Sequence, residues 1–529
     1  MNVLDRAIRA VNPEKALRRE YARRKLSVIE NSGYGNYGAN RYKSSVKGWA
    51  DSGGSSREDI EDNLPTLRQR CRDLYMGVPL ATGAVKTYRT SVIGAGLSLK
   101  PKVDAGGLGI PEEQADELEK QILREWNLWA DSTDCDASRL SNFYELQQLA
   151  FLNWMFSGDV LVLLPAWRRT GSVYDLRIQM VEADRCSTPM EKRNDLSDKI
   201  VDGVERDSRG EVTAYYISNR HPLGRGGYEL TWNRIKAYGE KTGRRNVLHL
   251  MNRERIGQVR GVPILAPIIE SLKQIGRYTE GELVAAVVAG FTTVFIQSED
   301  PGGNLLGEMI PEEEQVDAGN DSTVELSAGG IVELAPGETA NAVTPGRPNT
   351  SFDGFVTAIC KQIGAALELP QELLMKQFTA SYSASRGALL ESWKTFQMYR
   401  DWMASGFCQP IYEEWLSEAV AKGRIRAPGF FADPAIRKCY TGAEWYGPAQ
   451  GQLDPKKEAE AAALRVQFGF STGVREAMEI TSTDFADNIK EIRKETAMWK
   501  QAGISPQISA QSSGTEEDTA KQEKGDEGT

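Results

Sequence analysis

Apolar residues recur at helical spacing from about Leu64 onward. Residues 66–97 predict two helices that break around Gly77 and Pro79, because both residue types are unfavourable inside a helix. The segment PEEQADELEKQILREWNLWAD predicts a third helix, since Pro111 suits a first turn and acidic side chains suit a helix N-terminus. The first part of the chain is therefore predicted to be helical.

The period then changes from that of helices to that of strands. One more helix is predicted in NFYELQQLAFLNWMFSGD, with Asn142 as N-cap and Glu145 three residues later. The runs DVLVLLPAW and YDLRIQMVEA then predict two strands, and KIVDGVERDSRGEVTAYYI predicts a second hairpin that turns between Asp207 and Gly210. Together these elements predict one α+β domain over residues 64–260.

Helical periodicity dominates the second half of the chain. A long helix is predicted from Val262, and an acidic segment rich in Gly and Pro, with short strand candidates, follows at residues 293–345. Helix returns at residues 351–370 and again at residues 383–407, where Leu389, Leu390, Trp393, Phe396 and Met403 recur at helical spacing. Charged helices are predicted from DPKKEAEAAALRVQFGF onward.

The two ends of the chain have a different composition from the middle. Residues 1–50 carry eleven Lys or Arg against four acids, a net charge of +7, and residues 1–60 are rich in Gly, Asn and Ser. Residues 511–529 carry two Lys against six acids, a net charge of −4. We interpret the N-terminal part as a mobile arm, or as an arm that orders on a partner subunit or nucleic acid. The composition after Gly503 is typical of a disordered tail.

Bulk composition excludes several classes of protein. The net charge of −10 is not that of a domain that grips phosphates. No apolar run reaches the ~18–20 residues of a membrane span, and the N-terminus is no secretory signal. The six scattered cysteines predict reduced structural thiols, and the two histidines argue against histidine catalysis and metal sites. No cofactor or metal is expected, because the chain has no P-loop and its acidic segment lacks an EF-hand pattern.

The serines of FTASYSASRGALLESWKTFQMYR raise the question of catalysis. Ser381, Ser383 and Ser385 precede Arg386, and no S-x-x-K or G-x-S-x-G pattern accompanies them. An arginine remains protonated and cannot act as a base. We therefore interpret the segment as the entry to a helix, with Ser383 or Ser385 as the N-cap, and expect no enzyme activity.

Several segments together resemble one known family, the lambda-type portal proteins of tailed bacteriophages. They occur in the family's order between about Leu64 and Trp499. The segments are LRQRCRDLYMGVPLATGAVKTYRTSVIGAGL, MFSGDVLVLL, GVERDSRGEVTAYYISNRHP, LHLMNRERIGQVRGVPILAPII, GGIVELAPGE, IGAALELPQELL, SYSASRGALLESWKTF and DPKKEAEAA. The combination of GQVRGVP with YSASRGALLESW is the most specific part of the resemblance.

The resemblance implies an α+β portal fold assembled as a ring, with a mixed wing domain, long stem helices, a small α/β clip and a helical crown. The implied segments are a basic flexible arm (1–63), the wing (64–260), stem helix 1 (261–292), the clip (293–345), stem helix 2 (346–368), a channel loop with a long kinked helix (369–425), a C-terminal helical region or crown (426–502) and a disordered acidic tail (503–529). Ser381, Ser383, Ser385 and Arg386 would then lie at the channel loop, and Glu312, Glu313, Glu314 and Asp317 in the docking surface of the clip.

The resemblance also implies a function and partners. The ring, a dodecamer by analogy, would form the channel for DNA packaging and ejection at one capsid vertex, after assembly in the bacterial cytoplasm. Its partners would be other copies of the chain, double-stranded DNA that passes non-specifically, the terminase large subunit, the major capsid protein, and head-completion or tail adaptor proteins, with no membrane. The alternatives are a capsid, scaffold or connector component without a channel, and a hydrolase with an unrecognised carboxylate pair.

Overall fold

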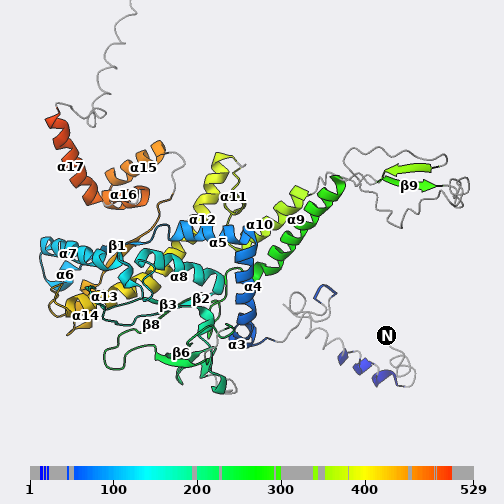
Figure 1. The fold of residues 1–529 in the computed structure, drawn as a ribbon, viewed down its shortest axis with the longest axis horizontal. Coiled ribbons are helices and arrows are strands. Elements are labelled where there is room, and N and C mark those ends of the chain that lie inside the picture. Colours follow the sequence, from blue (N-terminus) through cyan, green and yellow to red (C-terminus); the bar gives the residue numbers. More distant parts are fainter. Residues whose placement is uncertain are drawn as a thin grey trace, which may run out of the picture. The chain divides into compact units, whose positions relative to one another are not determined.

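The computed structural model describes most of the chain (Figure 1). The described residues are 12–15, 17–19, 21–22, 44–46, 53–192, 199–225, 229–290, 294–298, 338–342, 352–378, 381–450, 455–481, 483 and 485–502. The chain divides into two compact units, Met1–Asp62 and Asn63–Thr529. The first unit contains the short helix α3 (Ser56–Asp59), where the backbone N–H of Ser55 donates to the Glu58 carboxylate at 2.8 Å.

The second unit begins with the helices that the sequence predicts. They are α4 (Leu64–Gly77), α5 (Pro79–Val92), α7 (Glu112–Ala130) and α8 (Phe143–Ser157). The break between α4 and α5 is confirmed, with Val78 between the two helices. The predicted cap of α8 is also confirmed. The Asn142 side chain accepts from the Glu145 N–H at 3.0 Å, and the Glu145 carboxylate accepts from the Asn142 N–H at 3.0 Å.

One hydrophobic core joins these helices to helices from the second half of the chain. The later helices are α10 (Phe352–Ala366), α11 (Gln371–Met375), α12 (Tyr382–Met403) and α13 (Gln409–Ala421). At its centre, the ring of Trp126 meets Tyr412 and Trp415 edge-on, with centroids 5.7 and 5.1 Å apart. The helical core therefore extends well beyond residue 260.

A three-stranded sheet lies between this helical core and a second core. Its central strand, β2 (Asp159–Leu163), pairs antiparallel with β3 (Gln179–Val181) and with β8 (Val247–Met251). Alternate side chains of a strand point to opposite faces. Val160 and Val162 accordingly belong to the helical core, whereas Leu161 belongs to the second core.

The second core is closed by a four-stranded antiparallel sheet. Its strands are β4 (Ile200–Val201), β5 (Val204–Arg206), β6 (Val212–Ser218) and β7 (Trp232–Lys236), in that order. The predicted hairpin turn is confirmed, since Gly210 has φ 87° and its N–H donates to the Asp207 carbonyl at 3.1 Å. The run YDLRIQMVEA forms a strand only at its end, in β3.

Two further pairs of strands join distant segments. β1 (Ser98–Pro101) pairs antiparallel with β11 (Ala443–Tyr446), which the sequence did not predict. The strand β9 (Val294–Ser298) pairs antiparallel with β10 (Glu338–Ala342). The chain between β9 and β10 lies outside the described residues.

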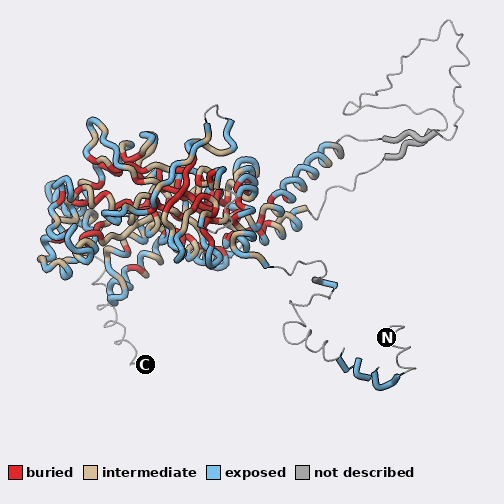
Figure 2. The backbone as a smooth tube through the Cα atoms, turned by 90° about the horizontal axis from the view of Figure 1, so that it is seen from below, coloured by how far each residue is buried: buried red, intermediate tan, exposed pale blue. Residues whose placement is uncertain are grey.

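The long helix predicted from Val262 starts later than expected. The helix α9 spans Ile269–Gly290 and follows a single 3-10 turn, Ala266–Ile268. Pro263 and Pro267 explain the correction, because a proline disfavours helical geometry at the residue before it and removes an N–H donor. Figure 2 shows α9 with mostly exposed positions along its length.

The helix predicted at residues 383–407 is present, with an irregular segment at its end. It begins at Tyr382 and passes through a π-helical segment, Ala404–Cys408, directly into α13. The Gln409 N–H donates to the Ala404 carbonyl, five residues back, as a π turn requires. Pro410, which has no N–H, stands in the first turn of α13, where its missing donor matters least.

Arg400 connects α12 to the end of α5. Its guanidinium donates to the carbonyl oxygens of Ser91 and Val92 at 3.0 and 3.2 Å, and to that of Pro448 at 2.9 Å. These contacts satisfy the last carbonyls of α5, where the helix dipole favours a cation. Burial lowers the pKa of Arg400 to about 10.

The C-terminal part is helical, as predicted. It contains α14 (Pro434–Tyr440), α15 (Pro455–Gln467), α16 (Gly473–Thr481) and α17 (Phe485–Gln501). The six cysteines are free. Within the described residues, every helix is too short or too polar to traverse a lipid bilayer.

Candidate functional site

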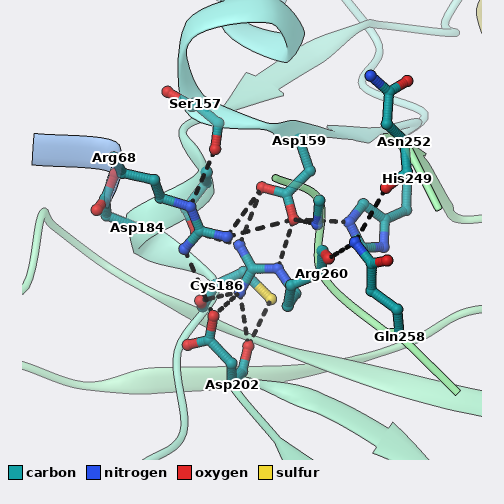
Figure 3. A network of polar contacts seen from close by, with 12 residues as sticks. Arg68, Ser157, Asp159, Asp184, Cys186, Asp202, His249, Asn252, Gln258 and Arg260 are labelled. Carbon is teal, nitrogen blue, oxygen red and sulfur yellow. Dashed lines mark hydrogen bonds and ion pairs between the residues drawn. The ribbon is translucent and has the colours of Figure 1, made fainter. Parts of the chain in front are cut away.

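A buried cluster of charges lies where α8 passes into β2 (Figure 3). Asp159, the first residue of β2, is completely buried. Its carboxylate accepts from Arg260 at 2.6 Å, from the Gly261 backbone N–H at 3.1 Å and from His249 at 3.1 Å. A carboxylate oxygen can only accept, so Nε2 of His249 carries the proton.

Arg260 provides most of the contacts in the cluster. Nε and Nη2 hold the two oxygens of Asp159 at 2.6 and 3.2 Å, a bidentate arrangement. Nη1 donates to the carboxylate of Asp202 at 2.9 Å and to the carbonyl oxygens of Asp202 and Cys186 at 2.7 and 2.8 Å. Nη2 also donates to the Ala183 carbonyl at 2.7 Å. Every nitrogen of the guanidinium therefore has a partner.

A second arginine approaches from α4. Arg68 is 2% exposed and donates to Asp159 at 3.3 Å, to Asp202 at 3.4 Å and to the Ser157 carbonyl at 3.1 Å. Figure 3 shows both guanidinium groups directed at Asp159 from different parts of the chain. The two arginines and the two aspartates balance in charge.

The turn between β4 and β5 places Asp202 in this cluster. Asp202 and Gly203 form a two-residue turn with φ 43° and 82°, and Val201 pairs with Val204. Positive φ at both positions is the geometry that favours Asp-Gly in a tight hairpin. A Cβ on Gly203 would lie 2.5 Å from the Ser187 backbone N, so this position also requires glycine for space.

Two glycines let the backbone close around Asp159. A Cβ on Gly158 would lie 2.4 Å from the Gly261 carbonyl oxygen, and a Cβ on Gly261 would lie 1.9 Å from the Gly158 carbonyl oxygen. Gly158 also has φ 88°. Any side chain at either position would force the two segments apart, and Gly261 would then lose its bond to Asp159.

The pKa shifts follow from burial and from these pairs. Burial alone would raise the pKa of Asp159, but Arg260 and Arg68 hold it well below its usual range. Burial alone would lower the pKa of Arg260, but Asp159 and Asp202 hold it well above its usual range. Burial raises the pKa of the Cys186 thiol to about 12, so this thiol is neutral and unreactive.

This arrangement holds distant chain segments together through paired charges. Its charged groups are paired with one another, and Arg68, Asp159 and Arg260 are buried, whereas the Asp202 side chain is 21% exposed. The chain's two histidines pair with aspartates of this region, His249 with Asp159 and His221 with Asp184 at 3.9 Å. The described residues contain no group of three or more potential metal ligands.

The cluster joins segments that carry the resemblance described above. Ser157 and Asp159 belong to MFSGDVLVLL, Arg260 to GQVRGVP and Arg68 to LRQRC. Sequence reasoning did not identify these residues as a set, because they lie about 90 and 100 residues apart. The available signal was an aspartate directly before a run of apolar residues, which needs a buried partner.

The structure corrects the predicted cap of the serine-rich helix. Ser381, not Ser383 or Ser385, occupies the N-cap position of α12, and its side chain forms no capping hydrogen bond. Ser385 is 8% exposed, whereas Ser381 and Ser383 are exposed. The sequence reasoning misplaced the cap because any of the three serines satisfies the residue preference.

Arg386 faces the C-terminal helices. Its guanidinium lies 3.9 Å from the Glu458 carboxylate on α15. Both residues line a cavity of about 780 Å³ between α12, β11, α15 and α16, together with Trp393, Arg465 and Arg475. The other predicted site residues, Glu312, Glu313, Glu314 and Asp317, lie outside the described residues.

Removing the negative charge of Asp159 should destabilise the subunit severely. In Asp159→Asn, Arg68 and Arg260 would remain buried without their central partner, so we expect a loss of about 3–5 kcal/mol in the free energy of unfolding. Urea denaturation followed by circular dichroism measures this loss.

Asp175→Asn is the matched control, because Asp175 and Lys422 form a partly exposed pair at 3.0 Å. Such pairs contribute about 0–1 kcal/mol. Equal losses for the two variants would contradict the importance assigned to the buried cluster.

Comparison with known proteins identifies the family. The lambda family of phage portal proteins matches residues 42–400. Portal protein B of Escherichia phage lambda is 23% identical over 498 residues, covering 91% of this chain and 92% of that protein. The portal protein of Escherichia phage N15 is 23% identical over 502 residues, covering 91% and 93%. A solved virion of a native gene transfer agent particle contains a chain that is 13% identical, with a TM-score of 0.42 and coverage of 79% of this chain and 92% of that chain. Because the family match spans well over half of the sequence, this chain belongs to the lambda family of phage portal proteins.

Proposed function

We propose that this chain is the portal subunit of a tailed phage, assembled as a ring at one capsid vertex. Double-stranded DNA would pass through the ring during packaging and ejection. The observation that carries the proposal is the family match over residues 42–400. The role is structural, since family membership supports a connector and not an enzyme.

Exposed apolar side chains on α9 support assembly with other copies. Leu283, Val284 and Val287 are 66%, 56% and 55% exposed, and Phe355 on α10 is 49% exposed. In a ring, neighbouring subunits would cover these side chains and gain the free energy of removing them from water.

The described helices and strands support a division of the chain into functional segments. We assign residues 1–63 to an arm, 64–260 to a wing and 426–502 to a C-terminal crown. The two helices α9 and α10 would form the stem, within residues 261–292 and 346–368. The segment 293–345, which begins and ends near the β9–β10 pair, would be the clip.

The partners follow from this role. The clip would face the terminase large subunit and the adaptor proteins, and the wing would face the major capsid protein. Residues 369–425 would include the channel loop, near Ser381 and Arg386. The net charge of −10 favours the passage of DNA without tight binding, because few phosphates would be neutralised on the way.

Purified protein should form rings with an axial opening. Electron microscopy of negatively stained particles measures this directly, and twelve-fold symmetry is expected by analogy with the family. Particles without an axial opening would favour the alternative, a capsid or scaffold component that has no channel.

Arg386 tests the assignment of the channel loop. Arg386→Glu rings should assemble but package or retain less DNA, if this side chain contacts phosphate. The double variant Arg386→Glu with Glu458→Arg restores an ion pair between α12 and α15. Recovery of packaging in the double variant would show that Arg386 acts through Glu458 and not through DNA.

Glu312, Glu313 and Glu314 test the assignment of the clip. Their joint replacement by Ala should leave ring formation intact and impair packaging, because a charged motor-facing surface is lost. Glu112 and Glu113, exposed at the start of α7, provide a control pair for the same replacement. Normal packaging by the clip variant would remove the support for this docking surface.

A further inference from the structure

The loop that follows β8 has an ordered architecture although it lies at the surface. Gln258 is 2% exposed, and its side chain forms hydrogen bonds to the backbone of the loop. Its side-chain oxygen accepts from the N–H groups of Glu254 and Arg255 at 2.8 and 3.1 Å. Its amide nitrogen donates to the carbonyl oxygens of Asn252 and Arg260 at 3.1 and 2.7 Å. The buried charge cluster and this loop are therefore connected through Arg260.

The loop presents an apolar side chain entirely to solvent. Ile256 is 101% exposed, and it is followed by Gly257 with φ 89°. Arg253 and Arg255 are exposed on the same loop. Because hydrogen bonds already hold the loop backbone in place, it loses little conformational entropy when a partner binds. An exposed isoleucine on such a loop is therefore suited to recognition.

The loop lies at the end of a basic segment, although the chain as a whole is acidic. Residues 219–255 carry nine Lys or Arg against three Glu, a net charge of +6, whereas the whole chain carries −10. The rest of each copy therefore carries −16. In an assembly of identical subunits, the opposite net charges of this segment and of the rest of the chain favour contact between neighbouring copies.

We propose that residues 252–257 form a contact between neighbouring copies of this chain, with Ile256 inserted into an apolar pocket of the next subunit. Arg253 and Arg255 face acidic side chains around that pocket. The contact is head-to-tail, because a ring joins two different surfaces of each subunit. This inference rests on the proposed ring and specifies part of its interface.

The exposed isoleucine decides between a protein partner and DNA. DNA phosphates would pair with the arginines but offer Ile256 no apolar contact. An apolar pocket on a protein would instead bury the Ile256 side chain. An isoleucine gains roughly 1.5–3 kcal/mol on full burial. Arginine is itself enriched at protein interfaces relative to the rest of the protein surface.

Photocrosslinking tests the contact without knowledge of the pocket. Ile256→p-benzoylphenylalanine, irradiated in assembled rings, should yield covalent subunit–subunit products, and peptide mass spectrometry should map them to one apolar pocket. The same probe at Leu140, an 80% exposed leucine far from the loop in sequence, is the control and should yield fewer such products. Products with DNA alone, or no products in rings, would overturn the proposal.

A charge at this position provides a second measurement. Ile256→Asp should raise the subunit concentration at which half of the protein assembles by about tenfold or more, as for a central interface residue. Leu140→Asp should leave this concentration unchanged. If wild-type protein forms rings and Ile256→Asp assembles equally well, the proposed contact at Ile256 is refuted, but the proposed ring is not. If wild-type protein forms no rings, the proposed function itself fails.

Discussion

The carboxylate of Asp159, buried with no access to water, is the constraint on which the β-rich part of the subunit depends. A lone buried charge would cost several kcal/mol, so the fold must bring cations to it. Arg260 and Arg68 meet it from two distant segments, and Asp202 balances the second positive charge. Each of these charged groups needs the others as ion-pair partners. The segments that carry them can therefore reach the native arrangement only together.

Because of its position, Asp159 connects several parts of the fold. It begins β2, whose side chains alternate between the helical core and the second core. Gly158 and Gly261 let the loop after β8 approach the start of β2, and Gln258 extends the same network to the surface loop. The buried cluster thus links the two cores with the surface that we assign to contact between subunits.

Local elements could be predicted from the sequence because their signals are local. The Asn142–Glu145 cap and the break at Val78 follow from residues that are neighbours along the chain. The start of α9 was misplaced because the apolar spacing after Val262 outweighed the two prolines within it. The cap of α12 was misplaced because three serines satisfy the same preference.

Long-range contacts could not be predicted from one sequence. The pairing of β1 with β11 joins Ser98 to Tyr446, and no residue spacing along the chain predicts this pairing. The charge cluster has the same character, although its segments were noticed individually. The resemblance identified which segments mattered, and the structure explains three of them by the contacts that they make with one another.

Hydrogen exchange of native protein tests the central role of Asp159 most directly. If the cluster holds these segments as one cooperative unit, Asp159→Asn should speed the exchange of amides in α4, β2, β8 and Gly261 together, by similar factors. Amides in α17, which does not contribute to the cluster, should exchange as in the unmodified protein. Faster exchange confined to β2, with α4 and β8 unchanged, would contradict the account.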